Sequence, residues 1–319
     1  MVNILTNIFR RFKIFFFKLK HFGIKVALWD LLYSQRRRIM IFTNFIIENK
    51  HKAVINWLSN NFNYFISEYK KEEIAPPVSG IPKQIWICWW DGIDSMPPIV
   101  RACYNSVLRN TGDFCITVIS KFNYNEFISI PGYILEKVNS GIMTITHFSN
   151  IIRMSLLGKY GGLWLDATIL VTGKIDFENL SFFTIRGDFG GEDVPKRRWT
   201  GNCIGGASNI ILFNFIREFL FEYWKKHDIM IDYFLYDYSI TLAYISVPEI
   251  KEIIDGVKKS NKNYMFLQDY LEKEFNRQLF DDSVSNTVFH KLSWKNSYPD
   301  YDSSNKLTLF GYLLNEYYN

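Results

Sequence analysis

The chain has 319 residues, of which 48% are hydrophobic and 18% aromatic, and its formal net charge at pH 7 is +5. This length allows a full hydrophobic core, and the composition is that of a globular protein. The charge is concentrated at one end, because residues 1–38 carry a net charge of +8 and the remaining residues −3. This distribution argues against a basic surface along the whole chain, so we expect no nucleic-acid partner.

The first 26 residues predict a basic amphipathic helix, with apolar residues on one face and basic residues largely elsewhere. The apolar set is Ile4, Leu5, Ile8, Phe9, Phe12, Phe15, Phe16, Leu19 and Phe22. Such a helix either lies in a membrane interface or packs its Phe-rich face against the rest of the protein, and periodicity does not distinguish the two. Basic residues interrupt the apolar run, so we expect neither a membrane-spanning helix nor a signal peptide.

The segment from Ala75 to Pro82, with the sequence APPVSGIP, is the clearest boundary in the chain. It separates a basic helical region, residues 1–75, from a second domain, residues 76–319. Strands and helices alternate in the second domain, which favours an α/β fold with a largely parallel sheet. The expected strands are residues 85–90, 114–120, 163–171, 182–186 and 202–207, and the expected helices include residues 98–109, 133–138 and 209–226, the last with Asn209 as its N-cap.

The stretch from His147 to Gly173 carries the strongest signs of chemistry. It begins with a helix whose apolar residues recur at helical spacing, while Asn150 and Arg153 lie on another side. A glycine-rich segment, residues 158–162, ends the helix and allows a tight reversal into a strand. One side of this helix therefore packs, and the other is available to hold a ligand.

The strand expected at residues 163–171 is apolar on both faces, yet Asp166 and Thr168 lie within it and point the same way as Trp164. An unpaired buried charge costs enough free energy that this carboxylate needs a partner. Either Asp166 accepts hydrogen bonds from backbone N–H groups of a neighbouring loop, or it belongs to a metal or nucleotide-phosphate site.

Three residues elsewhere are further candidates for the site. Trp89 lies at the carboxyl end of an expected strand, where it is either a core residue or a platform for a flat base. Asp237 lies among aromatic residues, which suits either a helix cap or a group that binds sugar hydroxyls. His290 is a lone histidine in an apolar setting, where a structural role is more common than metal binding.

Taken together, four blocks of the sequence resemble the capsular polysaccharide synthesis protein family. These bacterial glycosyltransferases are related to the yeast outer-chain mannosyltransferases and to the large glucosylating toxins. The blocks are IPKQIWICWWDG, HFSNIIRMSLLGKYGGLWLDATI, EYWKKHDIMIDYFLYDY and FHKL.

The resemblance implies a GT-A type, Rossmann-like nucleotide-binding domain that uses a nucleotide-sugar donor, a UDP- or GDP-sugar, and Mn²⁺ or Mg²⁺. It implies that Trp89 stacks on the donor base and that Asn150 and Arg153 contact the ribose, sugar or diphosphate, with Trp164 and Thr168 also on the donor. Asp166 falls on the first acidic position of the family's DxD motif, which binds the metal that neutralises the departing diphosphate.

The sequence departs from the wider family at two positions. The motif is Asp166-Ala167-Thr168, so a hydroxyl stands in place of the second carboxylate. Either Thr168 and His290 complete the metal shell, or the metal binds weakly and Arg153 carries more of the phosphate charge. Asn150 stands where relatives commonly have Asp, so it can bond a hydroxyl but supplies no charge.

We therefore expect a retaining glycosyltransferase that adds a sugar to a lipid-linked oligosaccharide of the capsule or O-antigen type, at the inner face of the cytoplasmic membrane. Asp166 and Arg153 act at the leaving diphosphate, and Asp237 is a candidate on the acceptor side. The alternatives are a metal-dependent nucleotidyl- or phosphotransferase and a catalytically impaired module that binds nucleotide sugars or a membrane surface.

Overall fold

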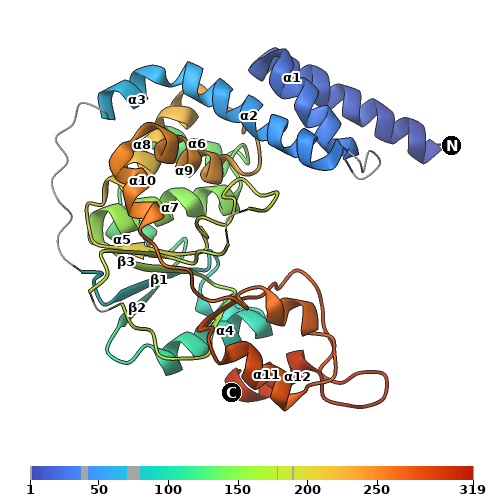
Figure 1. The fold of residues 1–319 in the computed structure, drawn as a ribbon, viewed down its shortest axis with the longest axis vertical. Helices are drawn as coiled ribbons and strands as arrows, with labels where there is room; N and C mark the ends of the chain where they lie inside the picture. Colours follow the sequence, from blue (N-terminus) through green and yellow to red (C-terminus); the bar gives the residue numbers. More distant parts are fainter. Residues whose placement is uncertain (1, 37–41, 70–79, 178, 189, 319) are drawn as a thin grey trace.

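The computed structural model describes residues 2–36, 42–69, 80–177, 179–188 and 190–318, with side chains from residue 9 onward. Its centre is a five-stranded sheet between two layers of helices, and a pair of N-terminal helices extends from one layer (Figure 1). The α/β fold with an N-terminal helical extension is therefore confirmed.

The central sheet has the strand order β2-β1-β3-β6-β5. Strands β2 and β3 both pair in parallel with β1, whereas β6 is antiparallel to its neighbours β3 and β5. Within this sheet only β6 is reversed, so the largely parallel arrangement expected from the alternating pattern is correct. The strands are β1 (Gln84–Cys88), β2 (Cys115–Ile119), β3 (Gly162–Asp166), β5 (Phe182–Thr184) and β6 (Cys203–Gly206).

Helices cover both faces of the sheet (Figure 1). One layer contains α7 and α8, and their interface with the sheet buries the large rings of Trp164, Phe148 and Phe213. The other layer contains α4, α11 and α12. The helical segments of the two layers are α4 (Pro98–Asn110), α5 (Tyr124–Phe127), α6 (Gly132–Asn139), α7 (Ile145–Tyr160), α8 (Ile211–Lys226), α9 (Leu235–Ser246), α10 (Pro248–Asp255), α11 (Arg277–Val284) and α12 (Leu309–Tyr317), with short 3₁₀ helices η2 (Ile93–Ser95) and η3 (Phe266–Tyr270).

The expected strand at residues 163–171 is wrong, because the chain turns in its middle. Strand β3 ends at Asp166, residues 167–168 form a turn, and β4 (Ile169–Val171) pairs with β7 (Phe289–Lys291) in a separate antiparallel sheet. A continuous apolar run does not reveal such a break, because both short strands are buried. The turn places Thr168 beside the C-terminal strand β7.

Most other expected helices and strands agree with the observed ones to within a few residues. Asn209 is an exception, because it is not the N-cap of α8. Helix α8 begins one residue later than that assignment requires, with Ile210 at the cap and no side-chain cap bond. Asn209 instead has a left-handed backbone, φ 63°, which asparagine tolerates well.

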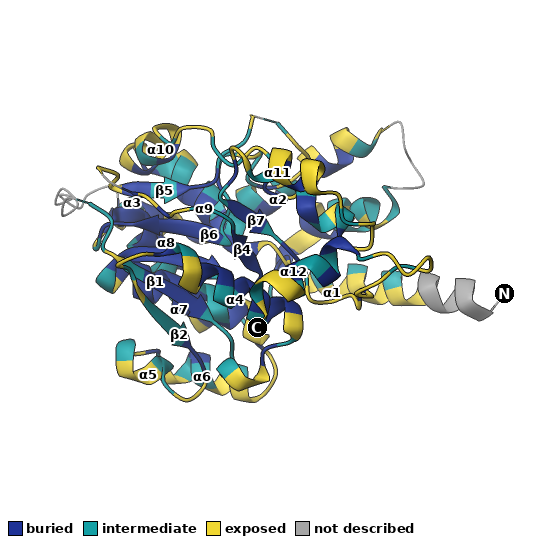
Figure 2. Cartoon of the chain, turned by 90° about the horizontal axis from the view of Figure 1, so that it is seen from below, coloured by how far each residue is buried: buried dark blue, intermediate teal, exposed yellow. Residues whose placement is uncertain are grey.

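The N-terminal arm consists of α1 (Val2–Gln35) and α2 (Thr43–Asn61), followed by α3 (Asn63–Tyr69). Helix α1 is interrupted at Gly23, whose φ of 79° is not helical. After this glycine the chain packs on α2, but before it the helix projects from the molecule with mostly exposed residues (Figure 2). Among the described residues, no helix combines the length and apolar character needed to cross a bilayer. The expected domain boundary at residue 75 lies outside the described residues.

Candidate functional site

Residues at the two ends of helix α7 fix where it begins and how the chain turns from it into strand β3. The Thr144 hydroxyl caps α7 by accepting a hydrogen bond from the His147 N–H at 3.2 Å. At the other end, Gly161 and Gly162 have φ of 68° and 96°. A Cβ on Gly162 would lie 2.5 Å from the Gln84 carbonyl oxygen, so only glycine fits this reversal. The turn brings the polar side of α7 against the end of β3.

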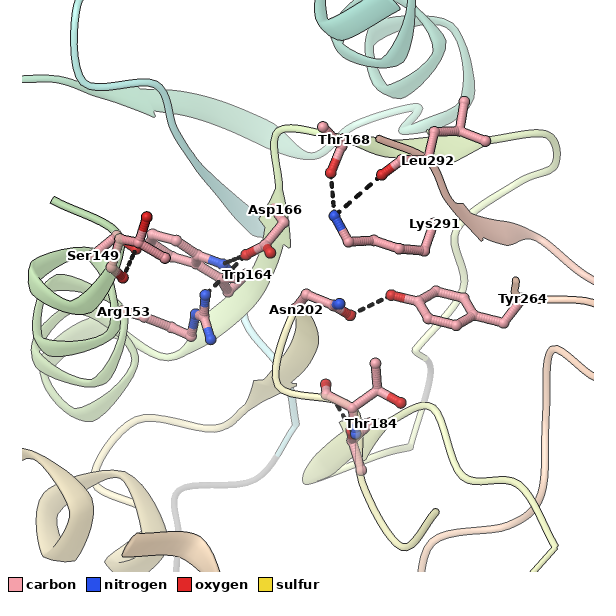
Figure 3. Close-up of polar contacts among 12 residues, drawn as sticks. Ser149, Arg153, Trp164, Asp166, Thr168, Thr184, Asn202, Tyr264, Lys291 and Leu292 are labelled. Atoms are coloured by element: carbon pink, nitrogen blue, oxygen red, sulfur yellow. Dashed lines mark hydrogen bonds and ion pairs between the residues drawn. The ribbon is translucent and has the colours of Figure 1, made fainter. Parts of the chain in front are cut away.

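At this junction Arg153 and Asp166 form an ion pair. The Arg153 Nη2 lies 2.8 Å from the Asp166 Oδ1, and the Trp164 indole N–H donates to the same oxygen at 2.8 Å (Figure 3). The Asp166 backbone N–H also donates to the Asn202 carbonyl at 2.9 Å. The partner that the Asp166 charge required is thus a guanidinium, supported by an indole, and not the backbone of a loop.

Arg153 is only 5% exposed and lies between two aromatic rings. Its guanidinium carbon is 4.8 Å from the centre of the Trp164 ring and 5.0 Å from that of Tyr236. Burial lowers the pKa of this guanidinium, but the Asp166 carboxylate, Tyr236 and Asp237 together raise it by more, so the net shift is upward. Arg153 is therefore a fixed positive charge.

Two atoms beside this pair are buried without a hydrogen-bond partner among the described residues, the Arg153 Nε and the Tyr236 hydroxyl. Buried polar groups in native proteins are nearly always paired, because each unsatisfied group costs about 1–3 kcal/mol. An incompletely satisfied cluster of this kind is typical of a site that a ligand completes.

A pocket of about 240 Å³ opens beside the ion pair. Of the residues predicted from the sequence, Asn150, Arg153, Asp166 and Asp237 all line it. The remaining lining residues are Thr144, Thr146, His147, Ser149, Gly201, Asn202, Met230, Tyr233, Phe234 and Tyr236. The pocket thus joins the end of β3 and one side of α7 to the first turn of α9.

Asp237 lies in the first turn of α9, where its Oδ1 accepts a hydrogen bond from the Trp199 indole at 3.2 Å. Burial raises the pKa of this carboxyl to about 6, while the Trp199 bond and the Arg153 charge act in the opposite direction. A carboxyl with this pKa exchanges a proton near neutral pH, as a group on the acceptor side of a transfer reaction would.

The residues assigned to a metal have other partners in the structure. Thr168 is buried, and its hydroxyl accepts a hydrogen bond from the Lys291 ammonium (Figure 3). His290 lies in β7, where its Nε2 contacts the Thr172 hydroxyl at 3.1 Å and the Thr287 carbonyl at 3.0 Å. Burial lowers the pKa of the His290 imidazole to about 4, so it is neutral at pH 7.

Asp166, Thr168 and His290, as the structure arranges them, do not fit a resident divalent cation. Mn²⁺ and Mg²⁺ prefer several oxygen ligands that include a free carboxylate, but here Asp166 is already paired with a guanidinium and Thr168 with an ammonium. Within the described residues, no group of three or more His, Cys, Asp or Glu side chains could hold a metal. The expected Mn²⁺ therefore stays a prediction that these residues, as arranged, do not support.

Trp89 lies outside the lining of this pocket. Its indole N–H donates to the Ser95 hydroxyl at 2.9 Å, and its ring meets that of Trp294 edge to face, with centroids 5.5 Å apart. Trp294 is 47% exposed, so the pair has an open side. The role of Trp89 in stacking on a base stays a prediction, as do the donor-binding roles of Trp164 and Thr168.

Sequence reasoning missed three side chains that shape the site: Trp199, Tyr236 and Lys291. The two aromatic residues contact Asp237 and Arg153 from segments whose pattern is dominated by core residues. Lys291 lies in the FHKL block next to His290, and a histidine is the more common metal ligand of the two. Its position beside Thr168 depends on strand pairing over 123 residues of sequence.

A family model described as capsular polysaccharide synthesis protein matches residues 39–313. The match covers most of the sequence, so the chain belongs to the capsular polysaccharide synthesis protein family. The resemblance drawn from the four sequence blocks is confirmed, and the mostly parallel α/β sheet is the fold expected for the family. The matched range includes α2 and α3 of the N-terminal arm.

The chain also has more distant similarity to three proteins named as glycosyltransferases. The O-glycosyltransferase PaGT of Phomopsis amygdali is 28% identical over 102 residues, which are 29% of this chain and only 25% of that protein. Among solved structures, the PaToxG glycosyltransferase has a TM-score of 0.38 at 13% identity and covers 66% of this chain and 82% of its own. The galactosyltransferase LgtC, in complex with donor and acceptor sugar analogues, has a TM-score of 0.37 at 12% identity, over 73% and 96% of the two chains. Similarity at these TM-scores adds no detail to the site.

Proposed function

We propose that this member of the capsular polysaccharide synthesis protein family is a retaining glycosyltransferase. It transfers a sugar from a nucleotide-sugar donor to a lipid-linked oligosaccharide during the synthesis of a capsule or O-antigen type polysaccharide. The family match supports the substrate class, and the pocket beside Arg153 and Asp166 supports the reaction.

The observation that carries the proposal is the buried ion pair at the wall of the pocket. A guanidinium presents planar donors that match phosphate oxygens, and its strength as a donor grows in a site with little water. Asp166 and the ring of Trp164 hold Arg153 in one orientation, so it does not have to be ordered when the donor binds. Asn150, one turn earlier on α7, lines the same pocket and offers an amide to a sugar or ribose hydroxyl.

The acceptor side of the pocket is formed by α9 and the segment before it. Asp237 provides a carboxyl whose pKa is raised to about 6. Tyr233 and Phe234 place exposed aromatic surface at the rim. Aromatic rings give the apolar face of a sugar a surface to pack on, while the carboxyl bonds its hydroxyls. In our proposal, the acceptor hydroxyl attacks the anomeric carbon from the face that the diphosphate leaves, which retains the configuration.

The N-terminal arm supports a location at the inner face of the cytoplasmic membrane. Phe9, Phe12 and Phe16 are 75%, 53% and 61% exposed, and basic residues such as Arg10 and Lys13 alternate with them. An exposed apolar face with adjacent positive charge is suited to the interface of a bilayer that contains anionic lipid. In our proposal, the arm keeps the enzyme near its lipid-linked acceptor.

Release of nucleotide from a panel of UDP- and GDP-sugars by the purified protein tests the proposal. We expect slow hydrolysis of one donor, faster turnover with a lipid-extracted acceptor, and a loss of about 100-fold or more in Asp166→Asn and Arg153→Met. The matched control is Glu272→Gln, which neutralises an exposed carboxylate away from the pocket and should leave turnover unchanged.

Product analysis separates the proposal from its alternatives. A glycosidic product with retained configuration supports it, whereas transfer of a nucleotidyl or phosphoryl group would assign the site to the other reaction class. Donor binding without turnover in the presence of acceptor would instead indicate a binding module.

A further inference from the structure

Lys291 is held in place beside the turn that follows Asp166. Strand β7 pairs with β4 so that Lys291 lies opposite Ile169, and the Lys291 backbone N–H donates to the Tyr264 carbonyl at 2.7 Å. Its half-buried side chain then reaches the Thr168 hydroxyl, and its Nζ also lies 3.3 Å from the Leu292 carbonyl. The ammonium is therefore fixed by backbone pairing and by two oxygen acceptors.

Two cations thus contact the three-residue segment Asp166-Ala167-Thr168. Figure 3 shows Arg153 on one side of Asp166 and Lys291 reaching Thr168 on the other side. Arg153 contacts Asp166 and Lys291 contacts Thr168, two residues later, and the Cα atoms of Asp166 and Thr168 are separated by about 7 Å at most. This segment is where the family resemblance placed a metal, and its one acidic residue is Asp166.

We propose that Lys291 takes the place of a divalent cation and binds the diphosphate of the donor together with Arg153. This inference rests on the proposed glycosyltransferase function. The Asp166 carboxylate offsets one of the two positive charges, so Arg153, Lys291 and Asp166 together carry a net charge of +1, which favours an anionic ligand such as a diphosphate. An ammonium beside a hydroxyl also explains why Thr168 can stand where the wider pattern has a second carboxylate.

The bonds, electrons and protons of the sugar transfer all balance without a metal. The bond between the anomeric carbon and the diphosphate oxygen breaks, and its electron pair stays on that oxygen. The acceptor oxygen forms the new bond to the anomeric carbon, and its proton passes to the departing diphosphate. Lys291 and Arg153 stabilise the negative charge as it develops on the leaving group.

Calorimetry with a nucleoside diphosphate and with the corresponding nucleoside, both in EDTA, tests the inference. We expect the wild type to bind the diphosphate without metal. Lys291→Met should weaken that binding by about 10- to 100-fold while leaving nucleoside binding unchanged, because only the charge on the phosphates loses its partner. Lys291→Arg should retain most of the affinity, and Lys258→Met, at an exposed lysine after α10, serves as the control.

Donor hydrolysis by the wild type gives a second measurement that needs no variant. Turnover that persists in EDTA supports the inference, whereas turnover that stops in EDTA and returns with Mn²⁺ overturns it and leaves the glycosyltransferase function intact. Unchanged diphosphate binding in Lys291→Met also overturns it. A wild type that binds no nucleoside diphosphate and hydrolyses no donor, with or without Mn²⁺, overturns both proposals.

Discussion

Helix α7 and the first part of α1 both carry apolar residues at helical spacing, but the structure uses them in opposite ways. From His147 to Gly158 nearly every residue of α7 is buried or half-buried, including the charged Arg153. In α1, Phe9, Phe12 and Phe16 are exposed although phenylalanine is more hydrophobic than arginine, and Phe22, where the helix reaches α2, is buried. Burial in this protein therefore follows the available partner surface, not the hydrophobicity of the segment.

The two regions also use glycine differently. Gly162 and Gly23 both have a positive φ, but the Cβ position of Gly162 is filled by the Gln84 backbone, whereas that of Gly23 has no atom within 4 Å. The first glycine allows two backbones to approach closely, and the second only lets a helix change direction. The backbone at Gly162 is thus restricted by a neighbouring strand, whereas no neighbouring atom restricts the bend at Gly23.

The largest expected effect is the loss of Asp166. Asp166→Ala leaves the Arg153 guanidinium buried without its counter-charge, and we expect the free energy of unfolding to fall by about 3–5 kcal/mol. Arg153→Met should cost less, because the Asp166 side chain is 29% exposed and can be hydrated. Urea denaturation followed by tryptophan fluorescence gives both values. Equal losses in the two variants would contradict the assignment of Arg153 as the buried partner.

The two glycines provide the next test. Gly162→Ala combines a left-handed backbone with a clash against Gln84, so we expect a loss of about 3 kcal/mol or more. Gly23→Ala meets no neighbour and should cost about 1–2 kcal/mol from its backbone alone, mainly by disturbing the bend in α1. Thermal unfolding of both variants checks the order. If Gly23→Ala is the more destabilising, the arm is packed more tightly than the structure indicates.

The pH dependence of the free energy of unfolding tests whether the Asp237 carboxyl at the pocket is buried. Folding raises the pKa of Asp237 to about 6 from its ordinary value of 3.8, so the folded state binds more protons than the unfolded state between these values. The stability contributed by this group is therefore present below about pH 4 and is lost as pH rises to about 6. Relative to the wild type, Asp237→Asn should gain about 1–3 kcal/mol at pH 7.5 and nothing at pH 4.

The same variant should lose turnover while it gains stability, a common exchange at functional sites. The measurement is the free energy of unfolding of wild type and of Asp237→Asn at both pH values. The difference between the two proteins removes the contribution of all other titrating groups, because these groups are the same in both. A stability difference that does not change with pH would mean that the Asp237 carboxyl is not shifted upward by burial.

The smallest effect on folding is expected in the arm. Changing Phe12 and Phe16 to Ser should alter the free energy of unfolding by less than about 0.5 kcal/mol, because neither ring is buried. Binding to vesicles that contain anionic lipid should fall by about tenfold or more, measured by co-sedimentation at constant salt. The control is Phe22→Ser, at a side chain 3% exposed against Trp57, which should cost about 3 kcal/mol of stability.

Sequence alone determined the parts of this protein that depend on local information. The apolar spacing of α7, the glycine reversal and the carboxylate of Asp166 were sufficient to predict a helix, a turn and a strand that carries a charge, but not that the strand ends at Asp166. Helical period and glycine torsion angles are properties of a few neighbouring residues, so they can be read without knowing the fold. The same holds for the family resemblance, which rests on short blocks.

Only the tertiary structure decided which distant groups meet at the site. The break between β3 and β4 follows from pairing with β7, and that pairing also brings Lys291 to Thr168 and gives His290 other partners. The contact of Trp199 with Asp237 likewise joins a loop to a helix that comes much later in the chain. These contacts depend on long-range packing, which leaves no periodic signal in the residues that make them.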